Sequence, residues 1–230
     1  PEIPSVSICT PTFNRRPFIP YLIKCIEAQD YPTDKIEWIV IDDGTDSIED
    51  LVKDISYCKY FRYEEKMSLG KKRNLMHEKA SGDVFVYMDD DDYYPPERIS
   101  HAVEMLKKNK RALAAGASKL SLYFKHINKV YEFGPYGPNH ATAGTFALKR
   151  QILQFTRYID ERAIAEEKKF LLDYQIPLVQ LESEKTIFVF SHEHNTFDKR
   201  KLLENINPKS KVTLETNKKP EDFIKDPELL

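Results

Sequence analysis

Short apolar runs alternate along the first half of the chain with segments whose apolar side chains recur every three or four positions. The runs are rich in β-branched or aromatic residues, as buried strands are, and they cover residues 6–9, 38–41, 60–63 and 84–88. Helical spacing occupies residues 18–26, 47–55, 69–79 and 95–106. This alternation predicts an α/β fold with a central, mostly parallel sheet flanked by helices.

The second half of the chain has a less regular pattern. It predicts paired strands at residues 120–124 and 129–133, strands at 145–148 and 186–190, and a helix at 161–173. The composition becomes polar and charged from about residue 205. We therefore expect a single domain over residues 1–204, with halves 1–110 and 111–204, followed by a polar C-terminal tail at 205–230.

Charge and composition exclude several classes of protein. Lys and Arg total 35 and Asp and Glu total 37, and a net charge of −2 argues against a broadly basic nucleic-acid binder. No apolar run approaches the ~18 residues that cross a bilayer, and the first residues do not resemble a signal peptide. The three cysteines are too far apart for a zinc knuckle. These features favour a cytoplasmic protein and leave peripheral membrane association open.

Polar clusters directly follow three of the predicted strands. They occupy residues 10–16, 42–45 and 89–92. Because the carboxyl ends of parallel strands meet at one edge of a sheet, all three clusters are expected on the same rim, where ligands of such folds bind. This convergence is the main functional signal in the sequence.

The third cluster consists of four consecutive aspartates at residues 89–92. Adjacent carboxylates repel one another and raise each other's pKa unless a cation lies between them. Hard carboxylate oxygens suit Mg²⁺ or Mn²⁺, and such a metal in turn suits a diphosphate ligand. The alternative is a solvated acidic turn that caps the helix beginning near Pro95. The residues argue against a calcium loop of the EF-hand type, because Tyr94 and Ser100 stand where it requires Gly and Glu.

The other two clusters fit recognition of a nucleotide. A carboxylate at residues 42–43 could accept the imide N–H of uracil or a ribose hydroxyl, although an Asx-turn would use the same residues. Phe13 could stack on a base beside backbone carbonyls near Pro11; alternatively it belongs to the core while Arg15 and Arg16 are solvated. The segment lacks the glycine patterns of dinucleotide sites and P-loops.

The motifs together resemble family 2 glycosyltransferases of the GT-A fold. The matching segments are residues 11–15, 41–45, 70–74, 82–84 and 89–92, in the order and spacing of that family. The resemblance is strong over residues 5–110 and looser over 140–196. It implies a Rossmann-like GT-A fold with a nucleotide-sugar-binding half at 1–110 and a smaller antiparallel portion on the acceptor side, within 111–204.

The resemblance further implies a metal-dependent, inverting transfer of a sugar from a nucleoside-diphosphate sugar, with a UDP-sugar as the expected donor, to a hydroxyl of a glycan or glycoconjugate. Asp89 and Asp91 would form the family's Asp-x-Asp motif, with Asp91 as the direct metal ligand and Asp89 nearer the ribose. Mn²⁺ is favoured over Mg²⁺. The implied nucleotide-sugar-binding residues are Pro11, Thr12, Phe13, Arg15, Asp43, Lys72, Arg73, Asp89 and Asp90. A solvated helix face is the alternative for Lys72 and Arg73.

Two further roles rest on the same resemblance. The family's general base matches Glu167, where an Asp is usual, with Glu166 as the alternative and a charged helix face as the structural interpretation. His192 matches a histidine that completes the metal shell in some relatives, with His194 as the alternative. Aromatic residues at 131, 133, 136 and 140 could stack on sugar rings or simply pack.

Two other functions remain to be weighed. A sugar-nucleotide nucleotidyltransferase needs a glycine-rich loop after the first strand, which residues 10–16 do not provide. A non-catalytic nucleotide- or glycan-binding module is compatible with the Glu at position 167. The identity of the sugar, the acceptor and the oligomeric state cannot be read from the sequence.

Overall fold

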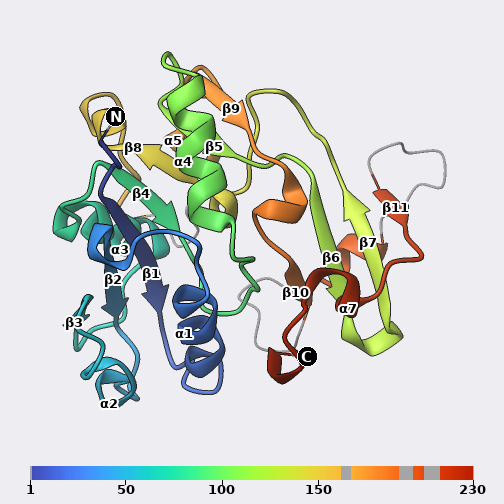
Figure 1. Ribbon diagram of the computed structural model, residues 1–230, viewed down its shortest axis with the longest axis horizontal. Helices are drawn as coiled ribbons and strands as arrows, with labels where there is room; N and C mark the ends of the chain where they lie inside the picture. Colours follow the sequence, from blue (N-terminus) through green and yellow to red (C-terminus); the bar gives the residue numbers. More distant parts are fainter. Residues whose placement is uncertain (1, 162–166, 192–198, 205–212, 230) are drawn as a thin grey trace.

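The computed structural model describes residues 2–161, 167–191, 199–204 and 213–229. Its larger sheet, within these residues, has the strand order β3-β2-β1-β4-β8-β5-β9 (Figure 1). The bounds are β1 Val6–Thr12, β2 Ile36–Asp42, β3 Cys58–Arg62, β4 Val84–Tyr87, β5 Ala114–Gly116, β8 Ala147–Lys149 and β9 Leu178–Gln180. Only β8 runs against its neighbours β4 and β5 among these strands. The predicted mostly parallel sheet is therefore confirmed.

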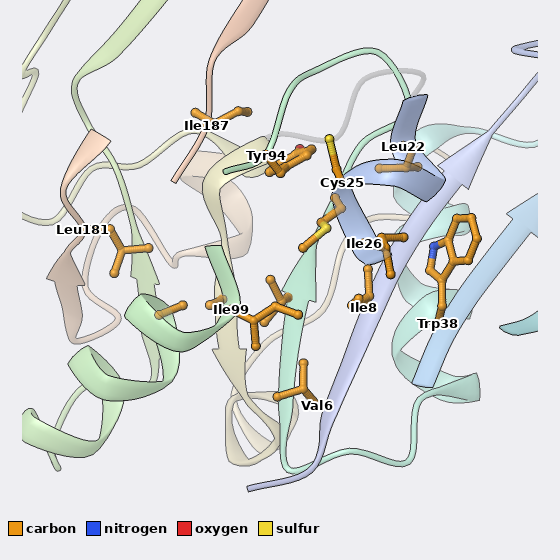
Figure 2. Packing of buried hydrophobic residues seen from close by; sticks show 14 of the residues in the cluster. Val6, Ile8, Leu22, Cys25, Ile26, Trp38, Tyr94, Ile99, Leu181 and Ile187 are labelled. Atoms are coloured by element: carbon orange, nitrogen blue, oxygen red, sulfur yellow. The ribbon is translucent and has the colours of Figure 1, made fainter. Parts of the chain in front are cut away.

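Helices cover both faces of this sheet because the strands are apolar on both sides. The helices α1 (Ile19–Glu27) and α4 (Arg98–Lys108) pack on one face, against residues such as Val6, Ile8 and Trp38 (Figure 2). The helix α3 (Leu69–Lys79) packs on the other, with Ile39 and Phe85. Successive strand residues thus point to opposite faces, as the period of two requires.

A second, smaller sheet forms from the second half of the chain. Its order is β10-β6-β7-β11, with β6 Leu120–Phe124, β7 Lys129–Phe133, β10 Val189–Ser191 and β11 Thr213–Glu215. The strands β6 and β7 have the predicted bounds, and β11 comes from the expected polar tail. That tail also packs its Phe223 ring on Phe188, with centroids 4.2 Å apart. The domain boundary after residue 204 stays a prediction.

The structure differs from the sequence prediction in the second half. The helix expected over residues 161–173 is described only as α5 Glu167–Phe170. It ends there because Leu172, Asp173 and Tyr174 have positive φ angles of 52°, 55° and 62°, which helical residues cannot adopt. The strands β5 and β9 were not predicted.

The remaining elements are short. They are α2 Glu49–Val52, α6 Lys201–Glu204, α7 Pro220–Phe223, η1 Thr33–Lys35, η2 Lys125–Ile127, η3 Ala143–Thr145, η4 Arg150–Gln154, η5 Ser183–Lys185 and η6 Pro227–Leu229. In the described part of the chain, no helix has the length and apolar character needed to cross a membrane.

The parallel strands bring the predicted clusters together. In the register of the sheet Thr12 lies beside Asp42, and Cys9 lies beside Tyr87. The ends of β1, β2 and β4 therefore form one rim, and the segments that follow them share it.

The buried histidine of α3, His77, makes the stability of the protein depend on pH. His77 on α3 is 3% exposed, and its Nε2 lies 2.6 Å from the hydroxyl of Tyr87. Burial, and next the charge of Arg73, lower the pKa of His77 to about 3, from 6.5 in the unfolded chain. Between these values the unfolded chain binds a proton that the folded chain does not, so stability falls as the pH drops through this window.

The expected result of this linkage is measurable by substitution. Between pH 7 and 4.5 the free energy of unfolding should fall by roughly 2–3 kcal/mol more in the parent than in His77→Gln. Urea denaturation at both pH values measures it. The exposed ring of His126 offers the control, because His126→Gln should leave the pH dependence of the parent unchanged. Equal pH dependence in His77→Gln and the parent would contradict the expectation.

Candidate active site at the carboxyl edge of the sheet

Asp42, at the end of β2, has a structural role in shaping the rim. Its carboxylate is fully buried and accepts hydrogen bonds from the N–H groups of Gly44 at 2.9 Å and Ile48 at 3.3 Å, and from the hydroxyl of Tyr60. This is the turn-forming role that we gave as the alternative for this cluster. It leaves the next carboxylate, Asp43, as the candidate for ligand recognition.

Asp43 is held from two sides in a buried position. Its Oδ1 lies 3.0 Å from the Nζ of Lys72, and its Oδ2 accepts the N–H of Met67 at 2.7 Å. The side chain of Asp43 is 0% exposed and that of Lys72 is 10% exposed. A carboxylate fixed in this way, at a strand end, is oriented before any ligand arrives.

The buried pair predicts a large stability difference between two similar substitutions. Asp43→Asn leaves the Lys72 charge without its partner in a site with little water, and should lower the free energy of unfolding by about 3 kcal/mol. Glu104→Gln breaks the exposed pair with Lys108 on α4 and should leave the free energy of unfolding nearly unchanged, because water screens this pair. Urea denaturation compares them, and similar losses would show that the Asp43 pair is not a buried ion pair in solution.

Phe13 and its neighbours form the part of the rim beside Asp43. Phe13 is partly exposed, and the Nζ of Lys66 lies 4.7 Å from its ring centroid. Pro11 and Thr12 are buried at the end of β1. Phe13 is thus not a core residue.

Asn14 joins two of the polar clusters, which the sequence did not indicate. It has a φ of 52°, and its Oδ1 accepts the N–H groups of Thr45 at 2.8 Å and Asp46 at 3.0 Å. Asn tolerates this left-handed conformation better than most residues. Arg16, in the first cluster, also connects the two clusters, because it pairs with Asp46, which directly follows the second cluster.

Arg73 binds the first aspartate of the acidic run. Its NH1 and NH2 lie 3.0 and 3.3 Å from the two carboxylate oxygens of Asp89, and its guanidinium lies 4.5 Å from the Tyr87 ring centroid. Lys72 and Arg73 are both buried, while Lys71 is exposed. The interpretation of residues 71–73 as a solvated helix face is therefore wrong for Lys72 and Arg73, because both pair with carboxylates at the rim.

Asp90 and Asp92 place further negative charge in buried positions of the acidic run, and each has a cation within ion-pair distance, Arg15 for Asp90 and Lys199 for Asp92. Asp90 accepts the hydroxyl of Thr12 at 2.8 Å and lies 3.9 Å from the Nε of Arg15. Burial, followed by repulsion from Asp91, raises the pKa of Asp90 to about 7, and burial also raises the pKa of Asp92 well above its usual range. A divalent cation would relieve this charge, so the donor set fits the expected metal.

A complete metal shell is not formed by these residues alone. Within the described ranges no group of three or more His, Cys, Asp or Glu side chains is placed to hold a metal ion. His192 and His194 lie outside the described residues. The assignment of Asp89, Asp91 and a histidine as ligands stays a prediction.

Glu167 lies close to the acidic run although it is far from it in sequence. Its Oε1 accepts the N–H of Ala143 at 3.1 Å. A Cβ placed on the next residue, Gly144, would lie 3.4 Å from Oδ2 of Asp89. The segment at Ala143 and Gly144 therefore lies between the two carboxylates. Glu166 lies outside the described residues.

Comparison with known proteins identifies the family of the chain. The family model described as Glycosyl transferase family 2 matches residues 7–155. The chain belongs to this family. The resemblance on which we based the site residues is therefore confirmed, and the match covers the whole rim formed by β1, β2 and β4.

Two named glycosyltransferases are similar to parts of the chain. A poly(ribitol-phosphate) β-N-acetylglucosaminyltransferase, TarS, of Staphylococcus aureus strain Mu50 is 27% identical over 116 residues, which are 45% of this chain and 19% of the relative. A GalNAc(5)-diNAcBac-PP-undecaprenol β-1,3-glucosyltransferase of Campylobacter jejuni is 34% identical over 112 residues, 45% of this chain and 34% of the relative. The chain thus spans a minor part of these relatives.

Solved structures confirm the fold. TarS residues 1–349 with UDP-GlcNAc superpose with a TM-score of 0.63 and 20% identity, covering 83% of this chain and 60% of that one. The mannosyltransferase PcManGT of Pyrobaculum calidifontis with GDP-Man and Mn²⁺ gives a TM-score of 0.67 and 17% identity, covering 84% and 59%. The chain has the GT-A fold of family 2.

The aromatic residues predicted on the acceptor side fall into two groups. Tyr131 and Phe133 pack against Phe124 in the second sheet, with centroids 5.6 and 6.2 Å away. Tyr136 and His140 instead lie with centroids 5.2 Å apart. Burial lowers the pKa of His140, and the charge of Glu167 acts in the opposite direction.

Proposed function

We propose that the chain is the donor-binding and catalytic domain of a metal-dependent, inverting glycosyltransferase. The observation that carries the proposal is the gathering of three charged groups at one edge of the sheet: the Lys72–Asp43 pair, the acidic run with Arg73, and Glu167. TarS with UDP-GlcNAc and PcManGT with GDP-Man and Mn²⁺ share the fold, which supports a nucleotide-sugar donor.

The rim offers a place for each part of a nucleotide sugar. Asp43 would accept a hydrogen bond from the base, preferably uracil, while Phe13 stacks on it beside Pro11 and Thr12. Arg15, Lys72 and Arg73 carry the positive charge that a diphosphate requires. The carboxylates of Asp89 and Asp91, with His192 as a further ligand or His194 as the alternative, would hold Mn²⁺ or Mg²⁺, and Asp90 would contribute to binding of the nucleotide sugar.

The chemistry follows from these positions. The acceptor hydroxyl attacks the anomeric carbon on the face opposite the nucleoside diphosphate, and Glu167 takes the hydroxyl proton on a carboxylate oxygen. The C–O bond to the diphosphate breaks as the new bond forms, so the configuration inverts without an intermediate on the protein. A bound divalent metal supplies neutralising charge to the departing diphosphate. Arg73 also carries positive charge at this place.

The acceptor class and the location of the protein are further parts of the proposal. A glycan or glycoconjugate hydroxyl is expected as the acceptor, because the ring of His140, which contacts the ring of Tyr136, feels the charge of Glu167 and both rings could stack on a sugar. A cytoplasmic location stays a prediction from the sequence.

A thermal-shift panel of nucleoside diphosphates and nucleotide sugars, with and without Mn²⁺, tests the proposal. A ligand that binds the folded state raises the melting temperature by mass action. We expect UDP or a UDP-sugar to give the largest shift, and the shift to grow with Mn²⁺. No stabilisation by any nucleotide in Mn²⁺ would overturn the proposal. A donor-hydrolysis assay then separates an enzyme from a non-catalytic binding module.

A further inference from the structure

Tyr94 connects two segments that carry different parts of the site. Its hydroxyl accepts the backbone N–H of Asp89 at 2.8 Å and donates to the carbonyl oxygen of Gly144 at 3.1 Å. Tyr94 is 1% exposed, and its ring packs in the core cluster with Cys25 and Ile187 (Figure 2). The position of the hydroxyl is therefore fixed by the core.

Arg98, the first residue of α4, connects the same two segments. Its NH2 donates to the carbonyl oxygens of Tyr87 at 3.1 Å and Phe146 at 2.8 Å. The side chain is fully buried. Arg98 and Tyr94 therefore each join residues 87–89, at the end of β4, to residues 144–146, before β8.

These contacts lie where the sheet ceases to join the two segments. The registered pairs between β4 and β8 run from Val84 with Lys149 to Val86 with Ala147. One more backbone bond follows, from the N–H of Tyr87 to the oxygen of Phe146. Beyond it the two side chains continue the connection, up to Asp89 on one segment and Gly144 on the other.

Packing alone does not explain a guanidinium at this place. In the described part of the chain, Nε and NH1 of Arg98 have no hydrogen-bond partner. Burial lowers the pKa of Arg98 to about 10, so the group still carries its charge at neutral pH. A buried charge with few partners is costly, and an apolar residue of similar volume is often as stable or more stable.

We propose that Tyr94 and Arg98 are positioning residues that hold the segment of Asp89 and the segment of Ala143 and Gly144 at a fixed separation. The consequence rests on the proposed function: Asp89 belongs to the donor and metal side, and the N–H of Ala143 holds Glu167, the candidate base. The pair then sets the distance between the groups that act on the donor and on the acceptor. A shift of about 1 Å in such a distance can cost on the order of 100-fold in rate.

The test compares Tyr94→Phe with a matched control. Both Tyr94→Phe and Tyr31→Phe remove one buried hydroxyl and keep the ring. The hydroxyl of Tyr31 donates to the oxygen of Pro4, which precedes β1 at the opposite edge of the sheet. A second variant, Arg98→Met, removes the other connection with little change in volume.

Hydrogen–deuterium exchange of the full chain gives the structural readout. Tyr94→Phe and Arg98→Met should each raise exchange at least about threefold in peptides covering 87–89 and in those covering 143–146, and Tyr31→Phe should not. Unchanged exchange in both peptides would overturn the inference. Arg98→Met also serves if Tyr94→Phe fails to fold.

Hydrolysis of UDP-GlcNAc in Mn²⁺ gives the functional readout. We expect kcat to fall roughly 10- to 100-fold in Tyr94→Phe, with KM within about twofold of the parent, and to stay unchanged in Tyr31→Phe. Faster exchange with an unchanged kcat would overturn the positioning role. If the parent protein neither binds nor hydrolyses any nucleotide sugar, the proposed function fails, while the exchange data still decide whether the two side chains hold the segments.

Discussion

Replacing Asp91 by Asn is expected to lower sugar transfer by about 1000-fold or more. A metal that neutralises the leaving diphosphate is worth several kcal/mol, and each 1.36 kcal/mol is about tenfold in rate. The substitution also removes one of the carboxylates that would hold the cation, so we expect the cluster to bind a cation more weakly. Initial rates with the nucleotide sugar that stabilises the protein, and calorimetric titration of UDP with and without Mn²⁺, measure both effects.

The control for this substitution is Asp34→Asn. Asp34 is exposed in η1, before β2 and away from the rim, so the change of one carboxylate to an amide should leave rate and binding as in the parent. If Asp91→Asn retained Mn²⁺-dependent binding of UDP at the parental affinity, Asp91 would not be the metal ligand, and Asp89 would become the first candidate.

Replacing Glu167 by Gln is expected to reduce transfer about 100- to 10,000-fold without weakening the binding of the donor. The amide oxygen of Gln can still accept the N–H of Ala143, so the segment next to Asp89 stays in place. The variant only lacks the group that takes the proton. Two measurements check this expectation: the rate of donor hydrolysis, which should fall, and the affinity for UDP in the presence of Mn²⁺, which should stay as in the parent.

Glu78→Gln, at an exposed position of α3, provides the matched control and should be fully active. Near-normal turnover of Glu167→Gln would show that another group is the base. Glu166→Gln is then the variant to measure, because Glu166 is the alternative that the family resemblance leaves open.

Much of the rim could be predicted from the sequence. The helix α3 and the strands β6 and β7 have the expected bounds, and β4 begins at the expected residue. These elements could be predicted because their signals are local. Either the apolar residues recur with the spacing of a helix or a strand, or a residue such as Gly82 marks the end of the element, as after α3. The order of strand and polar cluster predicts Asp43, Asp89 and Asp90 at one edge of the sheet.

The parts that could not be predicted depend on contacts distant in sequence. The strand β5 is Ala-Ala-Gly, which has no β-branched residue to mark it. Arg98 follows two prolines and a glutamate, a setting typical of an exposed first helical turn, yet it is fully buried. Only the meeting of β4 with the segment before β8 gives its guanidinium two carbonyl partners.

The pairing of β11 with β7 has a practical consequence for producing the protein. A version shortened at residue 204 would leave β7 as an open edge and would remove the ring that stacks on Phe188. Exposed strand edges recruit other chains, so such a version should aggregate on purification. Expression designs for crystallisation should therefore retain residues 205–229, polar as they look in the sequence.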